Sequence, residues 1–430
     1  MFIMECLGMS SEGHLSIGGM SVVALAKKYG TPLYIMDESQ IRKNCRMYKK
    51  ALSGYSGEFM VAYASKAFAC KEMYRIIAEE GFGADVVSGG ELHTALESGF
   101  SPEKIIFHGN NKTKVELCMA LENSVGRIAV DNLEELKVLS ELSVKLNKTV
   151  NILLRIKPGV EAHTHEFIKT GQIDSKFGFA LETGEAEEAV ELAMSAPNIS
   201  LNGVHCHIGS QIFDSEPFHL SAEILIKFII SMKNTYNANM TELNLGGGYG
   251  TAYLLKDDAP SIFTAITSLS SSINELMATH NIKLKLFLEP GRSIVADAGL
   301  TVYTVGSVKN IPNIRTYVSV DGGMTDNPRH ILYGAEYDAV LPERPIADCK
   351  NKVTIAGRCC ESGDVLIKDI DMPAIKSGDL LAILVTGAYN YSMAGNYNRV
   401  PRPPVIMVNN GIDRVVIKRE SYEDLIRNDI

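Results

Sequence analysis

The sequence has no C-x-x-C pair, no excess of basic residues and no apolar run long enough to cross a bilayer. Its eight cysteines are scattered over 430 residues, which argues against a disulfide framework and a zinc cluster. The formal net charge is −9, and the lysines and arginines form no patch for nucleic acid. The first residues contain Glu5 and no basic leader, unlike a signal peptide. These absences predict a cytoplasmic protein that binds neither nucleic acid nor membrane.

The residues that are present indicate a large globular fold. Hydrophobic residues make up 46% and charged residues 22% of the chain, and its length suits two domains. Between about residues 58 and 290, short β-rich runs alternate with helical runs. The expected strands are Phe59–Ala64, Ala84–Val87, Lys104–Phe107, Arg127–Val130, Asn151–Ile156, Leu201–His205, Glu242–Leu245 and Leu284–Leu288. Eight such units predict an α/β fold, a closed parallel (β/α)₈ TIM barrel, and favour it over an open doubly wound sheet.

The pattern changes after Arg292, where short strand-like runs follow one another with little helix. These runs are Thr301–Val308, Thr316–Val320, Lys352–Ile355, Leu380–Thr386, Val405–Val408 and Val415–Lys418. They predict an all-β C-terminal domain. The first 35 or so residues have no place in the barrel. We therefore expect the barrel to span residues 36–294 and a β-domain to combine residues 1–35 and 295–430.

Lys66 follows the first expected strand, in the run Tyr63-Ala64-Ser65-Lys66. An amine at the rim of a buried site of low dielectric constant can lose its proton and form a Schiff base with an aldehyde. The structural alternative is a lysine whose stem lies on apolar surface while its ammonium reaches water. The other strand ends decide between these two interpretations.

Polar residues and glycines gather at further strand ends, where barrel enzymes carry their chemistry. Gly246-Gly247-Gly248 follows the seventh strand, and its bare N–H groups can form a nest for a phosphate, although any tight turn also needs glycine. Glu289-Pro290-Gly291-Arg292 follows the eighth strand, where a structural ion pair is the alternative. His205 and His207 point to the same side at the end of the sixth strand, and Asp85 lies in the second.

Together these groups are what pyridoxal 5′-phosphate requires: an amine for the aldehyde, a nest for the phosphate, a flat ring and an acid. Glu289 would pair with the ring nitrogen and keep the pyridine protonated. A metal-dependent barrel hydrolase is the rival, because His205-x-His207 and His163-x-His165 have the spacing of metal ligands. That rival needs further ligands and leaves Lys66 and the glycines unexplained, so we expect no metal.

Motifs in a familiar order run through nearly the whole chain. They are Tyr63-Ala64-Ser65-Lys66, Gly83-Ala84-Asp85-Val86-Val87-Ser88-Gly89-Gly90-Glu91-Leu92, His108-Gly109-Asn110-Asn111-Lys112-Thr113, Lys176-Phe177-Gly178, His207-Ile208-Gly209-Ser210-Gln211, Gly246-Gly247-Gly248, Glu289-Pro290-Gly291-Arg292, Asp321-Gly322-Gly323-Met324, Cys360-Glu361-Ser362-Gly363-Asp364 and Asn396-Tyr397-Asn398-Arg399. By these motifs the chain resembles the fold-type III pyridoxal-phosphate decarboxylases, which have an alanine racemase-like barrel. Each motif alone is weak evidence for a family, but this many motifs in the same order are specific evidence.

The resemblance implies roles around pyridoxal 5′-phosphate. Lys66 is similar to the lysine that forms the internal aldimine, and His207 to the residue that lies flat on the pyridine ring. Glu289 is similar to the partner of the ring nitrogen. The other expected cofactor residues, most of them near the phosphate, are Asp85, Ser210, Gly247, Gly248, Pro290, Gly291, Arg292 and Tyr389.

Within the family the chain is similar to members that decarboxylate meso-2,6-diaminopimelate to L-lysine and CO₂ through an external aldimine, the last step of lysine biosynthesis. The far amino-acid head of this substrate needs cations for its carboxylate and an acid for its ammonium. The residues that resemble this subsite are Arg292, Arg329, Tyr333, Glu361 and Tyr389. Relatives that act on carboxynorspermidine or a basic amino acid share the cofactor residues and stay the alternative. His330, where many relatives have proline, leaves Arg329 and Tyr333 in register.

Cys360 resembles the acid that protonates Cα, reaching from the partner subunit into the site that contains Lys66. The resemblance thus implies a homodimer with two shared active sites. The structural alternative for Cys360 is a buried strand thiol. A non-enzymatic pyridoxal-phosphate carrier with a single barrel is a further rival, and the long β-domain counts against it. The sequence leaves open whether residues 163–176 form a lid over the substrate.

Overall fold

The computed structural model describes residues 2–160 and 175–430, and the chain divides into two compact units. The barrel unit comprises Cys45–Gly250 and Ala259–Ser293. The β unit comprises Met1–Asn44, Thr251–Asp258 and Ile294–Ile430. Within the two described stretches, no helix combines the length and apolar character that crossing a membrane requires.

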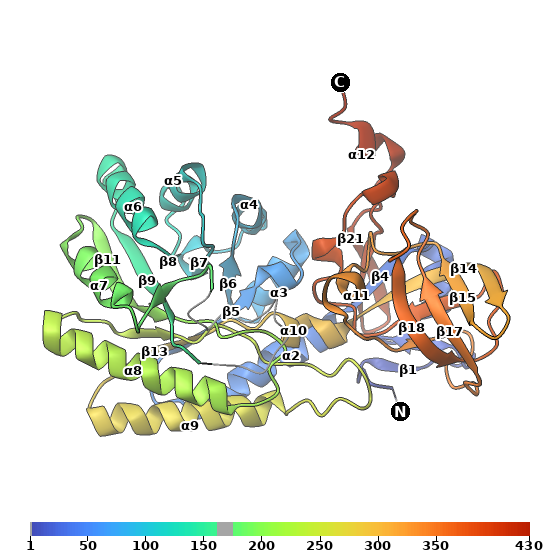
Figure 1. Cartoon of the computed structure of the whole chain (residues 1–430), viewed down its shortest axis with the longest axis horizontal. Coiled ribbons are helices and arrows are strands. Elements are labelled where there is room, and N and C mark those ends of the chain that lie inside the picture. The colour runs from blue at the N-terminus through green and yellow to red at the C-terminus, as the bar shows by residue number, and fades with distance from the viewer. Residues whose placement is uncertain (1, 161–174) are drawn as a thin grey trace. The chain divides into compact units, whose positions relative to one another are not determined.

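Eight parallel strands close into a ring in the barrel unit (Figure 1). They are β5 (Phe59–Ala64), β6 (Gly83–Val86), β7 (Ile105–Phe107), β8 (Arg127–Val130), β9 (Val150–Lys157), β11 (Ile199–His205), β12 (Glu242–Asn244) and β13 (Lys285–Leu288). Each strand pairs with the next along the chain, and β13 pairs with β5, so the sheet closes on itself. The predicted (β/α)₈ barrel is confirmed, and every expected strand lies within two residues of its observed ends.

Helices on the outside cover the ring (Figure 1). They are α3 (Lys71–Glu79), α4 (Gly89–Glu97), α5 (Lys114–Glu122), α6 (Leu133–Leu146), α7 (Glu185–Ser195), α8 (Glu216–Tyr236) and α9 (Ile262–His280). The strands are buried on both faces, because helices pack outside and side chains fill the inside. Helix α4 begins with two poor helix formers, Gly89 and Gly90. Ser88 caps it, accepting a hydrogen bond from the Glu91 N–H (3.2 Å).

The two ends of the barrel differ in chemistry. At the start of β8 and β12, Arg127 and Glu242 form a two-pronged ion pair, with Nε to Oε2 at 2.6 Å. The guanidinium carbon of Arg127 lies 4.9 Å from the centre of the Phe287 ring, and Phe287 packs against Ala62 and Ile106. These contacts fill the amino-terminal end of the barrel with structural interactions. Reactive groups are therefore expected at the other end.

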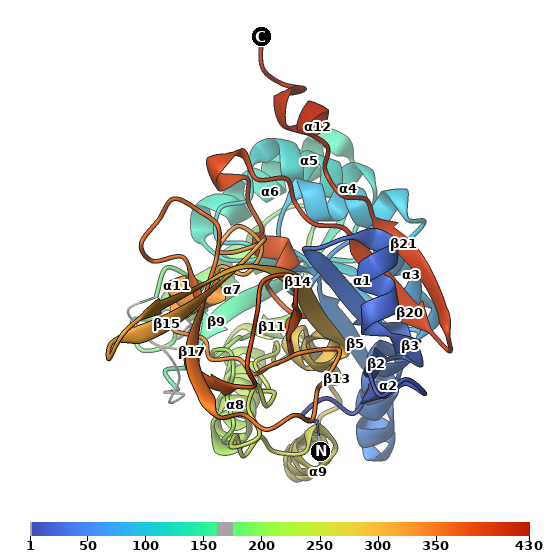
Figure 2. The ribbon, with the colours of Figure 1, turned by 90° about the vertical axis from the view of Figure 1, so that its right-hand side faces the viewer.

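A mainly antiparallel sheet organises the β unit (Figure 2). Its strand order is β18-β17-β15-β14-β4-β20-β21, with β19 also paired to β14. The strands are β4 (Leu33–Asp37), β14 (Gly299–Ile311), β15 (Arg315–Val320), β17 (Asn351–Ala356), β18 (Val365–Met372), β19 (Leu380–Ile383), β20 (Val405–Asn409) and β21 (Ile412–Ile417). The expectation of an all-β region after the barrel is confirmed. The sequence pattern missed β18, because Lys368, Asp369 and Asp371 interrupt its apolar run.

Short elements complete the fold. In the β unit, β1 (Leu7–Met9), β2 (Leu15–Ile17) and β3 (Met20–Ser21) form a small sheet. The remaining elements are α1 (Val22–Tyr29), α2 (Glu38–Ala51), β10 (Phe179–Ala180), α10 (Arg292–Val295), α11 (Arg329–Tyr333), β16 (Ala339–Val340) and α12 (Tyr422–Ile426).

Candidate active site

Five strand ends bring the expected cofactor residues of the barrel unit to its carboxyl-terminal end. Lys66 lies in the single 3₁₀ turn Ser65–Ala67 directly after β5, and its side chain is exposed. Asp85 is the third residue of β6. His207 and Ser210 follow β11, Gly247 and Gly248 follow β12, and the run Glu289-Pro290-Gly291-Arg292 follows β13. Parallel strands end at the same rim, so one topological feature places all of these residues together.

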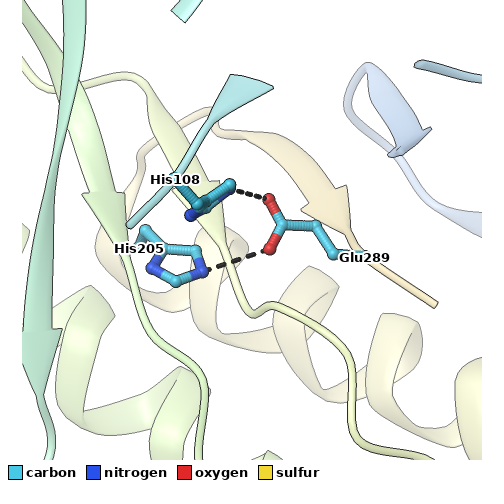
Figure 3. A group of neighbouring side chains, drawn as sticks. All are labelled: His108, His205 and Glu289. Carbon is cyan, nitrogen blue, oxygen red and sulfur yellow. Dashed lines mark hydrogen bonds and ion pairs between the residues drawn. The ribbon is translucent and has the colours of Figure 1, made fainter. Parts of the chain in front are cut away.

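Three side chains hold Glu289, and Figure 3 shows two of them, His108 and His205. Its Oε1 accepts hydrogen bonds from Asn244 Nδ2 (2.6 Å) and His108 Nε2 (2.7 Å), and its Oε2 pairs with His205 Nε2 (3.2 Å). Asn244 Oδ1 accepts from the Gly246 N–H (2.9 Å), which fixes the orientation of the amide. All four side chains are buried. In this arrangement both imidazoles present an Nε2–H to the carboxylate.

The electrostatics of this cluster keep the carboxylate charged and His205 neutral. Burial alone would raise the pKa of Glu289, but His108 and then His205 bring it well below its ordinary value. Burial lowers the pKa of His205 to about 3, against the opposing effect of Glu289. An ionised carboxylate in a buried ring of donors can therefore accept a further hydrogen bond from a positively charged group.

The same three residues resemble a metal site in composition. His108, His205 and Glu289 each offer one ligand atom, and these atoms lie within 4.8 Å of one another. A metal needs lone pairs from neutral imidazoles, whereas each Nε2 here is within hydrogen-bond reach of a carboxylate oxygen. Among the described residues this group does not include His207, which the rival metal-hydrolase interpretation pairs with His205. The second pair of that rival, His163-x-His165, lies outside the described residues.

Two further acids lie around Lys66. Asp85 Oδ1 is 4.0 Å from His108 Nε2 and has no hydrogen-bond partner in the described part of the chain. Burial raises the pKa of Asp85, while His108 and Lys66 oppose that rise. Burial also raises the pKa of Glu91 to about 7, although its carboxylate accepts from the Val87 N–H (2.8 Å). The ammonium of Lys66 is thus in the field of two carboxyl groups.

His207 is neutral in this environment. Burial, and then the charges of Lys66 and Arg155, hold its pKa well below the ordinary value. Gly246 makes room for the ring, since a Cβ at this position would lie 3.1 Å from His207 Nδ1. A neutral imidazole of this kind can stack on a flat aromatic ligand without charge repulsion.

The glycines after β12 are required by close backbone approach. A Cβ at Gly247 would lie 2.1 Å from the carbonyl oxygen of Glu289, and one at Gly248 would lie 2.5 Å from that of Gly209. Among the described residues, the N–H groups of Gly247 and Gly248 have no hydrogen-bond acceptor. Arg292, which is buried, donates from Nη2 to Ser210 Oγ (2.9 Å). Two bare N–H groups, a hydroxyl and a guanidinium are the donor set that a phosphate group binds.

A second polar cluster lies in the β unit around Arg329. Its guanidinium carbon is 5.4, 5.7 and 6.0 Å from the ring centres of Tyr253, Tyr389 and Tyr333. Nη1 donates to the Tyr253 hydroxyl (2.8 Å), and the buried Nε has no hydrogen-bond partner among the described residues. Burial opposes the charge of Arg329, but Tyr253 and Tyr337 raise its pKa. Among the described residues, no carboxylate forms an ion pair with this buried cation.

The turn between β17 and β18 carries Cys360 and Glu361, and both side chains are exposed. Cys360 is therefore not the buried strand thiol of the structural alternative, and its exposed side chain agrees with the expectation that it is available for chemistry. Asp364 holds the turn by accepting from the N–H groups of Met324 (2.6 Å) and Cys359 (2.8 Å). The turn packs against α11, since a Cβ at Gly363 would lie 3.0 Å from Ile331 Cδ1.

Sequence reasoning missed three of these residues. In the sequence, His108 belongs to a motif but has no assigned role, Asn244 lies within the expected strand Glu242–Leu245, and Tyr253 carries no signal. Polar residues at the end of a buried barrel strand could have indicated the first two, because such positions cost free energy unless they are paired. Tyr253 could not have been found, because its contact with Arg329 joins residues 76 positions apart.

Comparison with known proteins agrees with this geometry. Residues 38–296 match the family model described as the pyridoxal-binding domain of pyridoxal-dependent decarboxylases. The diaminopimelate decarboxylase of Bacillus subtilis (strain 168) is 49% identical over 100% of this chain and 98% of its own length. That of Bacillus methanolicus is 48% identical over 96% of this chain and 95% of its own length. The crystal structure of diaminopimelate decarboxylase from M. jannaschii in complex with L-lysine is 37% identical, has a TM-score of 0.92, and aligns over 100% of this chain and 99% of that one.

Proposed function

The chain belongs to the pyridoxal-dependent decarboxylases and, within them, to the diaminopimelate decarboxylases, and from this we propose the roles of its residues. The protein is a carboxy-lyase that decarboxylates meso-2,6-diaminopimelate to L-lysine and CO₂ with pyridoxal 5′-phosphate. When bound, the cofactor supplies a conjugated ring that accepts the electrons left on Cα as the carboxylate departs. The carboxynorspermidine and basic amino acid alternatives are not favoured by these relatives.

The donor groups of the barrel unit fit this cofactor. We propose that Lys66 carries it covalently through its aldehyde, and that Gly247, Gly248, Ser210, Arg292 and neighbouring Gly291 hold its phosphate. Support comes from the unused N–H groups of the two glycines and from the Arg292–Ser210 bond. Pro290 shapes the same turn, because its carbonyl accepts from the Ala64 N–H (3.0 Å) at the end of β5.

The ring of the cofactor would lie among His207, Glu289 and Asp85. His207 is neutral and suited to stacking on the ring, and Glu289 is an ionised acceptor for the protonated ring nitrogen. Asp85 contributes a second negative charge beside Lys66. We propose that these charges favour the protonated form of the ring, which is the better electron acceptor.

Substrate choice rests on one observation: Arg329 is a buried cation without a carboxylate in the described residues. We propose that the distal carboxylate of diaminopimelate binds there, with Tyr333, Tyr389 and Arg292 assisting. Glu361 would accept the distal ammonium. Lysine, ornithine and arginine have no distal carboxylate and would leave the guanidinium unpaired, which costs free energy in a buried site.

Some finer expectations remain proposals. We propose that the protein acts as a cytoplasmic homodimer with shared active sites, and that Cys360 of one subunit protonates Cα in the other. The expected domains, residues 36–294 and residues 1–35 with 295–430, likewise stay a prediction, supported by the family match to residues 38–296. Residues 163–176, for which the sequence leaves a role as a lid open, lie almost entirely outside the described residues.

The direct test is CO₂ release from four substrates. With the cofactor-loaded protein, we expect meso-diaminopimelate to be turned over and lysine, ornithine and arginine to have kcat/KM values lower by about 10⁴-fold, because they lack the second carboxylate. A rate on lysine, ornithine or arginine that equals or exceeds that on diaminopimelate would show that the substrate is assigned wrongly.

Replacing Cys360 by alanine is expected to slow turnover of diaminopimelate by roughly 10²–10⁴-fold, the usual contribution of a positioned acid. Cofactor binding should be unchanged, because Cys360 is not among the residues proposed to hold the cofactor. Cys349→Ala is the matched control, since Cys349 is also exposed but outside the proposed site. A wild-type rate for Cys360→Ala would mean that another group delivers the proton.

A further inference from the structure

We propose that His108 is the positioning residue of Glu289, and that its hydrogen bond lets Glu289 bind the cofactor through the ring nitrogen. This inference rests on the proposed cofactor site and adds a residue to it. His108 is the first residue after β7, and β7 pairs with β6, the strand that carries Asp85. It contributes no group to the substrate or the phosphate in the roles proposed above.

The hydrogen bonds divide the Glu289 carboxylate into two unequal edges. Oε1 accepts two short bonds, from Asn244 Nδ2 (2.6 Å) and His108 Nε2 (2.7 Å). Oε2 has one longer contact, with His205 Nε2 (3.2 Å). A carboxylate offers about four lone-pair positions, so Oε2 keeps the greater capacity for a new donor. His108 thus fixes one edge of the carboxylate and leaves the other able to accept.

His108 also stands between two buried carboxyl groups (Figure 3 shows its side towards Glu289). Its Nε2 is 2.7 Å from Glu289 Oε1 and 4.0 Å from Asp85 Oδ1. Asp85 and Glu289 destabilise each other's charge, since Glu289 contributes to the raised pKa of Asp85. Among the groups that lower the pKa values of Asp85 and Glu289, His108 has the largest effect on both. Without it, two buried acids would face each other with less compensation, and one would take up a proton.

His205 cannot substitute for this contact. The His205–Glu289 bond is 3.2 Å long, which is 0.5 Å longer than the His108–Glu289 bond of 2.7 Å. The Nδ1 atom of His205 has no hydrogen-bond partner among the described residues. The rings of His108 and His205 are 4.6 Å apart between centres, so each supports the position of the other. The unequal hydrogen bonding of the two Glu289 oxygens therefore comes mainly from His108 and Asn244.

The test compares two cofactors that differ in one atom. Holoenzyme is resolved with hydroxylamine, and the apoprotein is titrated with pyridoxal 5′-phosphate or with its 1-deaza analogue, in which CH replaces the ring nitrogen. In the wild type, we expect the natural cofactor to bind about 10- to 100-fold more tightly, as a hydrogen bond between charged groups predicts. In His108→Phe, which keeps a ring but no donor, the preference should fall to within about threefold.

Two further variants keep the test decisive. His108→Gln retains an N–H donor at a similar reach and should restore most of the preference, and His108→Leu replaces the phenylalanine variant if that protein does not fold. His219→Phe is the matched control, because His219 lies on α8 and contacts Ser272 (Nδ1 to Oγ, 2.9 Å) rather than the cofactor groups. It should behave as the wild type does.

The outcomes separate this inference from the proposed function. A wild-type protein that binds neither cofactor would refute the cofactor site itself. A wild type that binds both equally would refute the proposed pairing of Glu289 with the ring nitrogen, and the inference with it. A His108→Phe protein that keeps the wild-type preference would overturn the inference alone. Equal weakening of both cofactors by His108→Phe would also overturn it, because His108 would then only shape the site.

Discussion

Replacing Lys66 by alanine is expected to leave the protein colourless after reconstitution and without measurable turnover of diaminopimelate. Lys66 is the single lysine in the turn after β5, and its exposed amine lies in the field of Asp85 and Glu91. Removing the amine removes the covalent attachment of the cofactor aldehyde. Absorbance in the visible range and borohydride reduction followed by peptide mapping measure the two effects.

A matched lysine provides the control for this experiment. Lys71 begins α3, only five positions along the chain, and its ammonium forms an exposed ion pair with Glu97 (3.4 Å). Lys71→Ala should keep the colour, the reduced adduct at Lys66 and the wild-type rate. Full activity in Lys66→Ala, or an adduct at another lysine, would end the assignment of the covalent site.

Replacing Arg329 by alanine is expected to reduce kcat/KM for diaminopimelate by about 10⁴-fold, the scale at which a buried polar site rejects a substrate that cannot pair with it. The reason is that the guanidinium is buried among Tyr253, Tyr333 and Tyr389 and lacks a carboxylate in the described residues. Arg329→Lys should recover only part of the loss, since an ammonium cannot form two parallel bonds to a carboxylate. Steady-state kinetics of CO₂ release measure both variants.

The variants must also bind the cofactor normally for this prediction to hold. Arg315→Ala is the control, because Arg315 is a half-buried arginine of the β unit whose Nε is 3.2 Å from Asp369 Oδ1. It should leave kcat/KM unchanged. If Arg329→Ala lowers the rates on diaminopimelate and lysine by the same factor, then Arg329 supports the fold and does not read the distal carboxylate.

The elements of the barrel were predictable because their signals are local. β8, for example, is Arg127–Val130 both in the pattern and in the structure. A short apolar run with turn residues beside it indicates a strand, whichever neighbouring strand it pairs with in the fold. Strand β18 is not among the expected strands, because its charged residues contradict the local preference for a strand. Tertiary packing overrode propensity there.

By itself the sequence determined that eight strand–helix units close into a barrel and which motif residues stand at the strand ends. The spacing of hydrophobic residues and the residue types at turns depend on only a few neighbouring positions, so both can be recognised in the sequence. Only the tertiary structure decided how Glu289 is ionised, since its partners His108, His205 and Asn244 lie 181, 84 and 45 positions away. Likewise, the tyrosine surroundings of Arg329 exist only after the chain folds, because burial and charge depend on distances in space.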